Sequence, residues 1–163
     1  MNLKRFAVLI ILFTIVIAGV SAFGLGAQFN FNAGQIFAPG AALLISPGDI
    51  THIAFNWYLD FDKKNVVGFT ADLAPLTLPI SKFGIGSFNF TLGIGLFANV
   101  VLTNDPGVDG GLRIPFGLNI LLVRDIFEIF AHIAPSFGVH FLPSLGLSRP
   151  FFPIAIGARF WIR

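Results

Sequence analysis

Glu128, His132 and Ser136 are residue types that can supply an acid, a base and a nucleophile, and they are spaced four residues apart. Such a set works only when its side chains lie within hydrogen-bonding distance of one another. The surrounding residues alternate in the manner of a β-strand, and four residues of a strand span about 13 Å. The spacing therefore predicts separate roles for the three side chains, and we expect no catalytic residues and no enzyme activity.

Metal binding and thiol chemistry are the next possibilities. His52 and His140 do not form a cluster with nearby carboxylates, and the chain has no cysteine. A protein zinc site needs three or four such ligands close together. We therefore expect no metal site, no cofactor and no disulfide framework.

Charged side chains within strand-like segments form a second candidate group. Asp72, Arg113, Glu128, His132 and Arg159 all have the parity opposite to that of the apolar side chains around them. If the apolar side chains face lipid, these five face the interior, where a charge needs a partner. We expect them to form an interior polar network in which Glu128 and Arg159 lie at similar depth.

Strands of period two would position these residues. In residues 153–163, Ile154, Ile156, Ala158, Phe160 and Ile162 occupy one parity, and no polar atom interrupts that face. The same alternation predicts eight strands, at residues 23–33, 40–46, 50–59, 66–75, 87–101, 112–123, 126–140 and 153–163. Between them we expect solvated loops at 60–65, 103–111 and 141–150, a connection at 75–86 and tight turns at 46–49 and 124–125.

The turn at Arg124 and Asp125 also fixes a register. Pairing of the flanking strands across a two-residue turn places Gly117 opposite His132 and Asn119 opposite Phe130. This pairing sets Glu128 just beyond the turn.

Three prolines, Pro115, Pro135 and Pro153, fall inside predicted strands. Each removes one hydrogen-bond donor from the ladder. We expect bulges or ragged strand ends at these positions.

A helical membrane protein is the main alternative, because residues 83–102 are uncharged over a length that could span a bilayer as a helix. Within that segment, Asn89, Thr91 and Asn99 fall on one parity together with Gly93 and Gly95. A helix would spread these positions around its circumference, whereas a strand collects them on one side. The pattern favours a closed barrel, which like a helix satisfies every backbone group in lipid.

The amino terminus has the pattern of a signal peptide. Lys4 and Arg5 precede an uncharged apolar run that ends in small residues near Ala22. We expect residues 1–22 to be removed and residues 23–163 to form one domain. Loss of the two basic residues leaves eight basic against eight acidic residues, which gives no electrostatic footprint for nucleic acid. Apolar residues make up 55% of the chain and charged residues 11%, a composition that indicates lipid as the solvent.

The chain resembles small eight-stranded outer-membrane proteins of the OmpA transmembrane domain, OmpX and OmpW type. Gly157, Phe160 and Ile162 match the glycine, aromatic and hydrophobic positions of the carboxyl-terminal insertion signal in such proteins. Ala155 and Arg163 depart from that signal. The resemblance implies an all-β, membrane-spanning, antiparallel up-and-down barrel in the bacterial outer membrane. It also implies outer-membrane lipid, the barrel assembly machinery and periplasmic chaperones as partners of a monomer.

The expected function is that of a small integral barrel with a structural or surface-presenting role, because the interior of eight strands is only wide enough to be filled by side chains. A conduit or binder for a small apolar ligand is the alternative, supported by inward Tyr58, Phe97 and Phe130. A lipid-modifying barrel enzyme is disfavoured by the spacing on residues 126–140.

Overall fold

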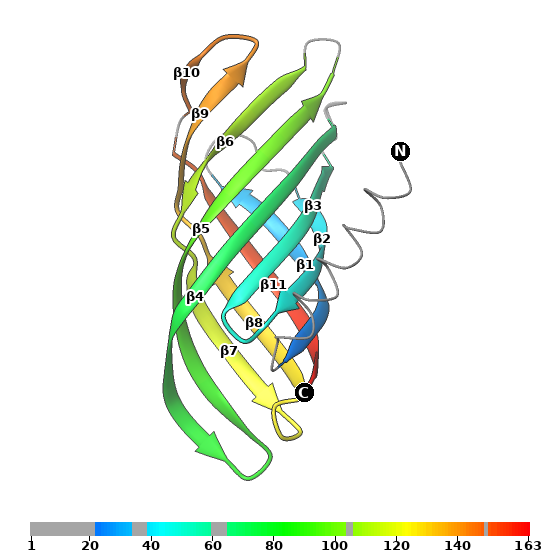
Figure 1. The fold of residues 1–163 in the computed structure, drawn as a ribbon, viewed down its shortest axis with the longest axis vertical. Helices are drawn as coiled ribbons and strands as arrows, with labels where there is room; N and C mark the ends of the chain where they lie inside the picture. The colour runs from blue at the N-terminus through cyan, green and yellow to red at the C-terminus, as the bar shows by residue number, and fades with distance from the viewer. Residues whose placement is uncertain (1–21, 34–38, 60–64, 104–105, 149) are drawn as a thin grey trace, which may run out of the picture.

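The protein is a closed antiparallel β-barrel (Figure 1). The computed structural model describes residues 22–33, 39–59, 65–103, 106–148 and 150–163. The predicted signal peptide lies outside the described residues except for Ala22. Among the described residues, no helix is long and apolar enough to cross a membrane.

Eleven strand segments make up the barrel wall. They are β1 (Phe23–Ala33), β2 (Pro39–Pro47), β3 (Thr51–Leu59), β4 (Asn65–Phe83), β5 (Gly86–Leu102), β6 (Gly107–Arg113), β7 (Phe116–Leu122), β8 (Phe127–Ile133), β9 (Ser136–Leu142), β10 (Gly146–Leu147) and β11 (Phe152–Ile162). β5 pairs with both β6 and β7, β11 pairs with β8 and β10 pairs with β9. The segments β6–β7, β8–β9 and β10–β11 are therefore three interrupted strands, and pairing of β1 with β11 closes a barrel of eight. The predicted all-β, up-and-down barrel is confirmed.

Three prolines on neighbouring strands accept backbone hydrogen bonds from the strand beside them. The N–H of Gly93 donates to Pro115 O, that of Ile114 to Pro135 O, and that of Ala134 to Pro153 O. Each proline carbonyl accepts the bond that continues the wall, although the proline has no N–H of its own. The expected irregularities at Pro115 and Pro135 are confirmed as the breaks between β6 and β7 and between β8 and β9, whereas Pro153 lies within β11 opposite Asn32.

The turn between β7 and β8 keeps the predicted register but is wider than predicted. Gly117 lies opposite His132, and Asn119 opposite Phe130, as expected. The innermost pair is Leu122 and Phe127, so residues 123–126 form the turn, with positive φ at Val123, Arg124 and Asp125.

Three predicted connections are wrong in whole or in part. The predicted loop at 141–150 contains the end of β9 and the two residues of β10. Residues 75–83 continue β4 beside β5, with register shifts near Pro75 and Pro79 that let each proline remain in the strand. Residues 107–111 belong to β6 rather than to a solvated loop, because they pair with both β5 and β9.

The two ends of the barrel differ. The end with the turns 48–50, 84–85 and 123–126 also carries Ala22 and Arg163, and we call it the short-turn end. The opposite end, where β1, β3, β5 and β9 end and β2, β4 and β6 begin, is the loop end. The β4–β5 hairpin extends farthest at the short-turn end, well beyond the start of β3 (Figure 1).

Candidate functional site

Glu128 is the centre of a buried polar cluster near the short-turn end. It lies directly opposite Arg159 across β8 and β11, and its Oε2 is 3.3 Å from Arg159 Nη1. Trp161 Nε1 donates to the same oxygen at 2.8 Å, and Asn119 Nδ2 donates to Oε1 at 2.8 Å. Both carboxylate oxygens therefore have donors, and the cluster joins β7, β8 and β11.

Arg159 is held by rings as well as by the carboxylate. Its guanidinium carbon lies 5.1 Å from the centre of the Phe130 ring and 5.2 Å from that of Trp161. Its Nη1 also lies 3.0 Å from Nδ1 of His52, on β3, three strands away around the wall. These contacts confine the cation to one place inside the wall.

A second ion pair lies farther toward the loop end. Arg113 Nε is 3.2 Å from Asp72 Oδ1, although the two groups lack the alignment of a hydrogen bond. Arg113 Nη2 approaches His132 Nε2 at 3.4 Å. A cavity of about 40 Å³ borders Asp72, Arg113 and Arg159, which is enough for a water molecule that could serve their unpaired atoms.

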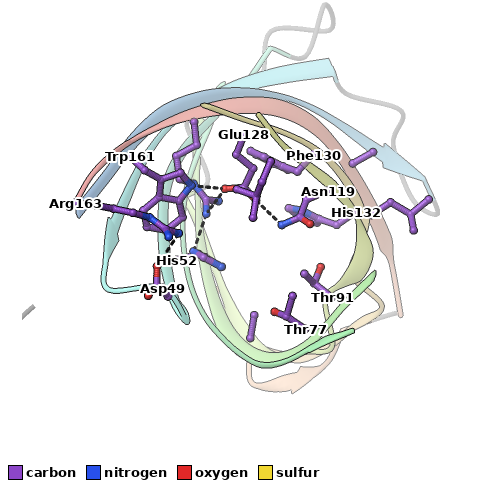
Figure 2. A pocket seen from close by; sticks show the side chains of 15 residues that line it. Asp49, His52, Thr77, Thr91, Asn119, Glu128, Phe130, His132, Trp161 and Arg163 are labelled. Carbon is purple, nitrogen blue, oxygen red and sulfur yellow. Dashed lines mark hydrogen bonds and ion pairs between the residues drawn. The ribbon is translucent and has the colours of Figure 1, made fainter. Parts of the chain in front are cut away.

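A larger cavity, of about 270 Å³, occupies the interior at the short-turn end (Figure 2). One wall carries Glu128 and Trp161, together with Arg159, which is paired with Glu128. The opposite wall carries Thr77 and Thr91, which are direct cross-strand partners. The cavity therefore has charged and aromatic groups on one side and hydroxyl groups on the other.

Aromatic side chains fill the barrel toward the loop end. Phe97 and Phe151 meet edge to face with ring centres 5.0 Å apart. A Cβ at Gly138 would lie only 2.7 Å from Cζ of Phe97, so the absence of a side chain there makes room for the ring. Phe97 and Tyr58 are both almost fully buried. These rings lie in the interior between the large cavity and the loop end.

The structure places all five residues of the predicted polar network on the inner wall. Glu128 and Arg159 form one pair, Asp72 and Arg113 the other, and His132 contacts Arg113. The sequence reasoning missed four polar members, which are His52, Asn89, Asn119 and Trp161. Nδ1 of His52 also lies 3.0 Å from Oγ of Ser46. Their inward parity was a usable signal, but it does not reveal which side chains meet across the lumen.

The three residues of the tested catalytic set have separate partners. Ser136 Oγ donates to Ala134 O at 2.7 Å, beyond the break between β8 and β9. His132 stacks on Phe130 with ring centres 5.7 Å apart, while Glu128 binds Arg159 and its neighbours. Within the described residues, no group of three or more His, Asp or Glu side chains could hold a metal ion.

The residues of the predicted insertion signal divide between the two faces of β11. Phe160 and Ile162 are exposed on the outer face. A Cβ at Gly157 would lie 2.6 Å from Cζ of Phe130, its cross-strand partner's ring. Gly157 therefore has a packing role inside the barrel, whatever its part in insertion.

Comparison with known proteins identifies the fold. No family model matches the chain, and no curated protein matches it. The amino-terminal β-barrel domain of Pseudomonas aeruginosa OprF is similar, with a TM-score of 0.50 and 13% identity over 88% of this chain and 98% of that one. Ail, the attachment invasion locus protein of Yersinia pestis, has a TM-score of 0.41 and 12% identity over 86% of this chain and 97% of that one. By its likeness to the OprF domain, the chain has the fold of a small outer-membrane β-barrel.

Proposed function

We propose that the protein is a small integral barrel of the bacterial outer membrane with a structural or loop-presenting role and no general pore. Outward apolar side chains would contact lipid, and the short-turn end would face the periplasm, as is usual for such barrels. The signal peptide would be removed, and periplasmic chaperones and the barrel assembly machinery would act on the chain before it functions as a monomer.

The observation that carries this proposal is the set of buried aromatic side chains in the interior between the 270 Å³ cavity and the loop end. Phe97, Phe151 and Tyr58 lie beyond the Asp72–Arg113 pair, where a water column would have to pass. A lumen of eight strands leaves little space once such side chains meet within it.

Conductance and fractionation test the two parts of the proposal. The full chain expressed in a Gram-negative host should fractionate with the outer membrane and migrate as a heat-modifiable band. The purified protein should give no steady, large conductance in planar bilayers, with a general porin as the positive control. Stable openings comparable to those of the porin would contradict the packed interior, and recovery in the soluble or inner-membrane fraction would contradict the location.

Binding of a small apolar or amphipathic ligand is a second candidate, favoured by the 270 Å³ cavity and its Phe130 and Trp161 walls. In a Trp57→Phe variant, Trp161 is the remaining tryptophan and reports on the cavity. Short-chain alcohols should change its fluorescence in a saturable way. A further Thr91→Phe change, which fills the cavity from the opposite wall, should abolish that response; a response that persists would contradict binding in the cavity.

A further inference from the structure

The part of β4 nearest the short-turn end, residues 76–83, has one edge that pairs with no other strand among the described residues. β3 pairs with β4 from Asn65 to Leu73, and the N–H of Ala74 donates to Ile50 O. Beyond that point, residues 76–83 pair only with β5, and every residue from Pro75 to Phe83 is exposed. This open edge is the same edge of β4 that pairs with β3 closer to the loop end.

Backbone groups point out of this edge. The N–H of Gly93 donates to Pro115 O, away from β4, so residues of the same parity on β5 are also bonded away from β4. Their partners Thr77, opposite Thr91, and Lys82, opposite Ser87, therefore direct both N–H and C=O at the open edge. Pro79 shares this orientation and offers a carbonyl alone.

The two faces of this segment are unlike. Leu76, Leu78 and Ile80 are 40%, 48% and 56% exposed, and the first two have the parity of the outer face of β5. Thr77 lies on the cavity side (Figure 2). A strand edge with unpaired N–H and C=O groups beside an apolar face is a template for pairing with another extended chain. A strand added to this edge would satisfy those groups.

A second copy of the chain does not fit this place. Antiparallel pairing of two such edges needs a two-fold axis normal to the wall, which would insert the second barrel upside down. Parallel pairing needs a two-fold axis parallel to the strands, which turns the second sheet over. The apolar face of one copy would then continue into the polar face of the other.

We propose that residues 76–83 form a docking edge for an extended segment of a periplasmic protein, added as a β-strand in line with β3. This placement rests on the orientation in the proposed function. The segment would carry apolar side chains beside Leu76 and Leu78, polar ones on the cavity side, and an acidic one near Lys82, which has no ion-pair partner among the described residues. Main-chain bonds would supply affinity and the alternate side chains specificity.

A labelled peptide tests the edge directly. The probe alternates valine and threonine and carries one glutamate, and its binding to the full mature barrel is measured by fluorescence anisotropy in nanodiscs and in detergent. We expect saturable binding to the barrel. Thr77→Pro, which removes an edge donor without removing a bond to β5, should weaken binding about fivefold. Thr77→Val keeps the donor and is the matched control.

Charge exchange supplies the second arm. Lys82→Glu should weaken the glutamate peptide roughly two- to fivefold and favour the same peptide with lysine in its place. Heat-modifiable mobility confirms that each variant is folded. Absence of binding, or equal binding by the Thr77→Pro and Thr77→Val variants, would overturn the docking edge, as would disulfide-linked dimers of a Leu78→Cys variant. Because the detergent measurement does not depend on cellular location, failure of outer-membrane fractionation would count against the proposed function alone.

Discussion

Replacement of Glu128 by glutamine should destabilise the barrel by about 3 kcal/mol, the lower part of the range for breaking a buried ion pair. The carboxylate accepts from Asn119 and Trp161 through different oxygens and neutralises Arg159 at 3.3 Å. A glutamine side chain offers one acceptor oxygen and no charge, so the guanidinium of Arg159 would stay buried without an anion. The adjacent 270 Å³ cavity places the loss at the lower end of the range, because water there can reach both residues.

Reversible urea unfolding in lipid vesicles, followed by heat-modifiable mobility, measures this loss. Arg159→Met removes the stranded charge, so the double variant should be more stable than Glu128→Gln alone, with a coupling energy of about 2 kcal/mol. A loss below about 0.5 kcal/mol for Glu128→Gln would refute the argument. Additive losses in the double variant would show that the two side chains act independently.

Three further expectations concern the faces of the wall and its packing. Brominated acyl chains should quench the fluorescence of Trp57, which is 59% exposed on the outer face, but not that of Trp161, which is 4% exposed. Single Trp→Phe variants separate the two signals. Equal quenching of both would contradict the assigned faces. Gly157→Val should lower stability by about 1 to 3 kcal/mol, because a Cβ there would lie 2.5 Å from Ala27 O and 2.6 Å from Cζ of Phe130. Since Phe130→Ala relieves the second contact, the double variant should lose less in urea unfolding than the sum of the two single losses; additive losses would show that the contact with Phe130 is not responsible. Circular dichroism of residues 23–163 in detergent should show a β-rich spectrum, and strong helical minima would contradict the fold.

The open edge of β4 follows from the way the barrel closes. The tight connections 48–50, 84–85 and 123–126 join neighbouring strands almost without stagger. A closed barrel nevertheless requires an overall shear between its first and last strands. In this chain the offset appears at the short-turn end, where β3 begins at Thr51 opposite Leu73 while β4 continues to Phe83. One side of the β4–β5 hairpin is therefore unpaired.

The amino-acid sequence by itself determined the strands, their faces and one register. Alternation with period two assigns every side chain to a face, which is why Asp72, Arg113, Glu128 and Arg159 could be placed inside. A short turn fixes its two strands locally, which is why Gly117 could be set opposite His132. Pro75 misled the prediction of β4, because a bulge lets a strand continue past a residue that would otherwise end it.

Only the tertiary structure decided which inward side chains meet. His52 and Arg159 are 107 residues apart, and their contact depends on the shear with which β1 closes onto β11. Pairing of β8 with β11 brings Trp161 to Glu128, and the closed wall leaves a cavity between Arg159 and Thr77. Period and turn length act between neighbouring strands, whereas distances across the lumen depend on all eight strands together.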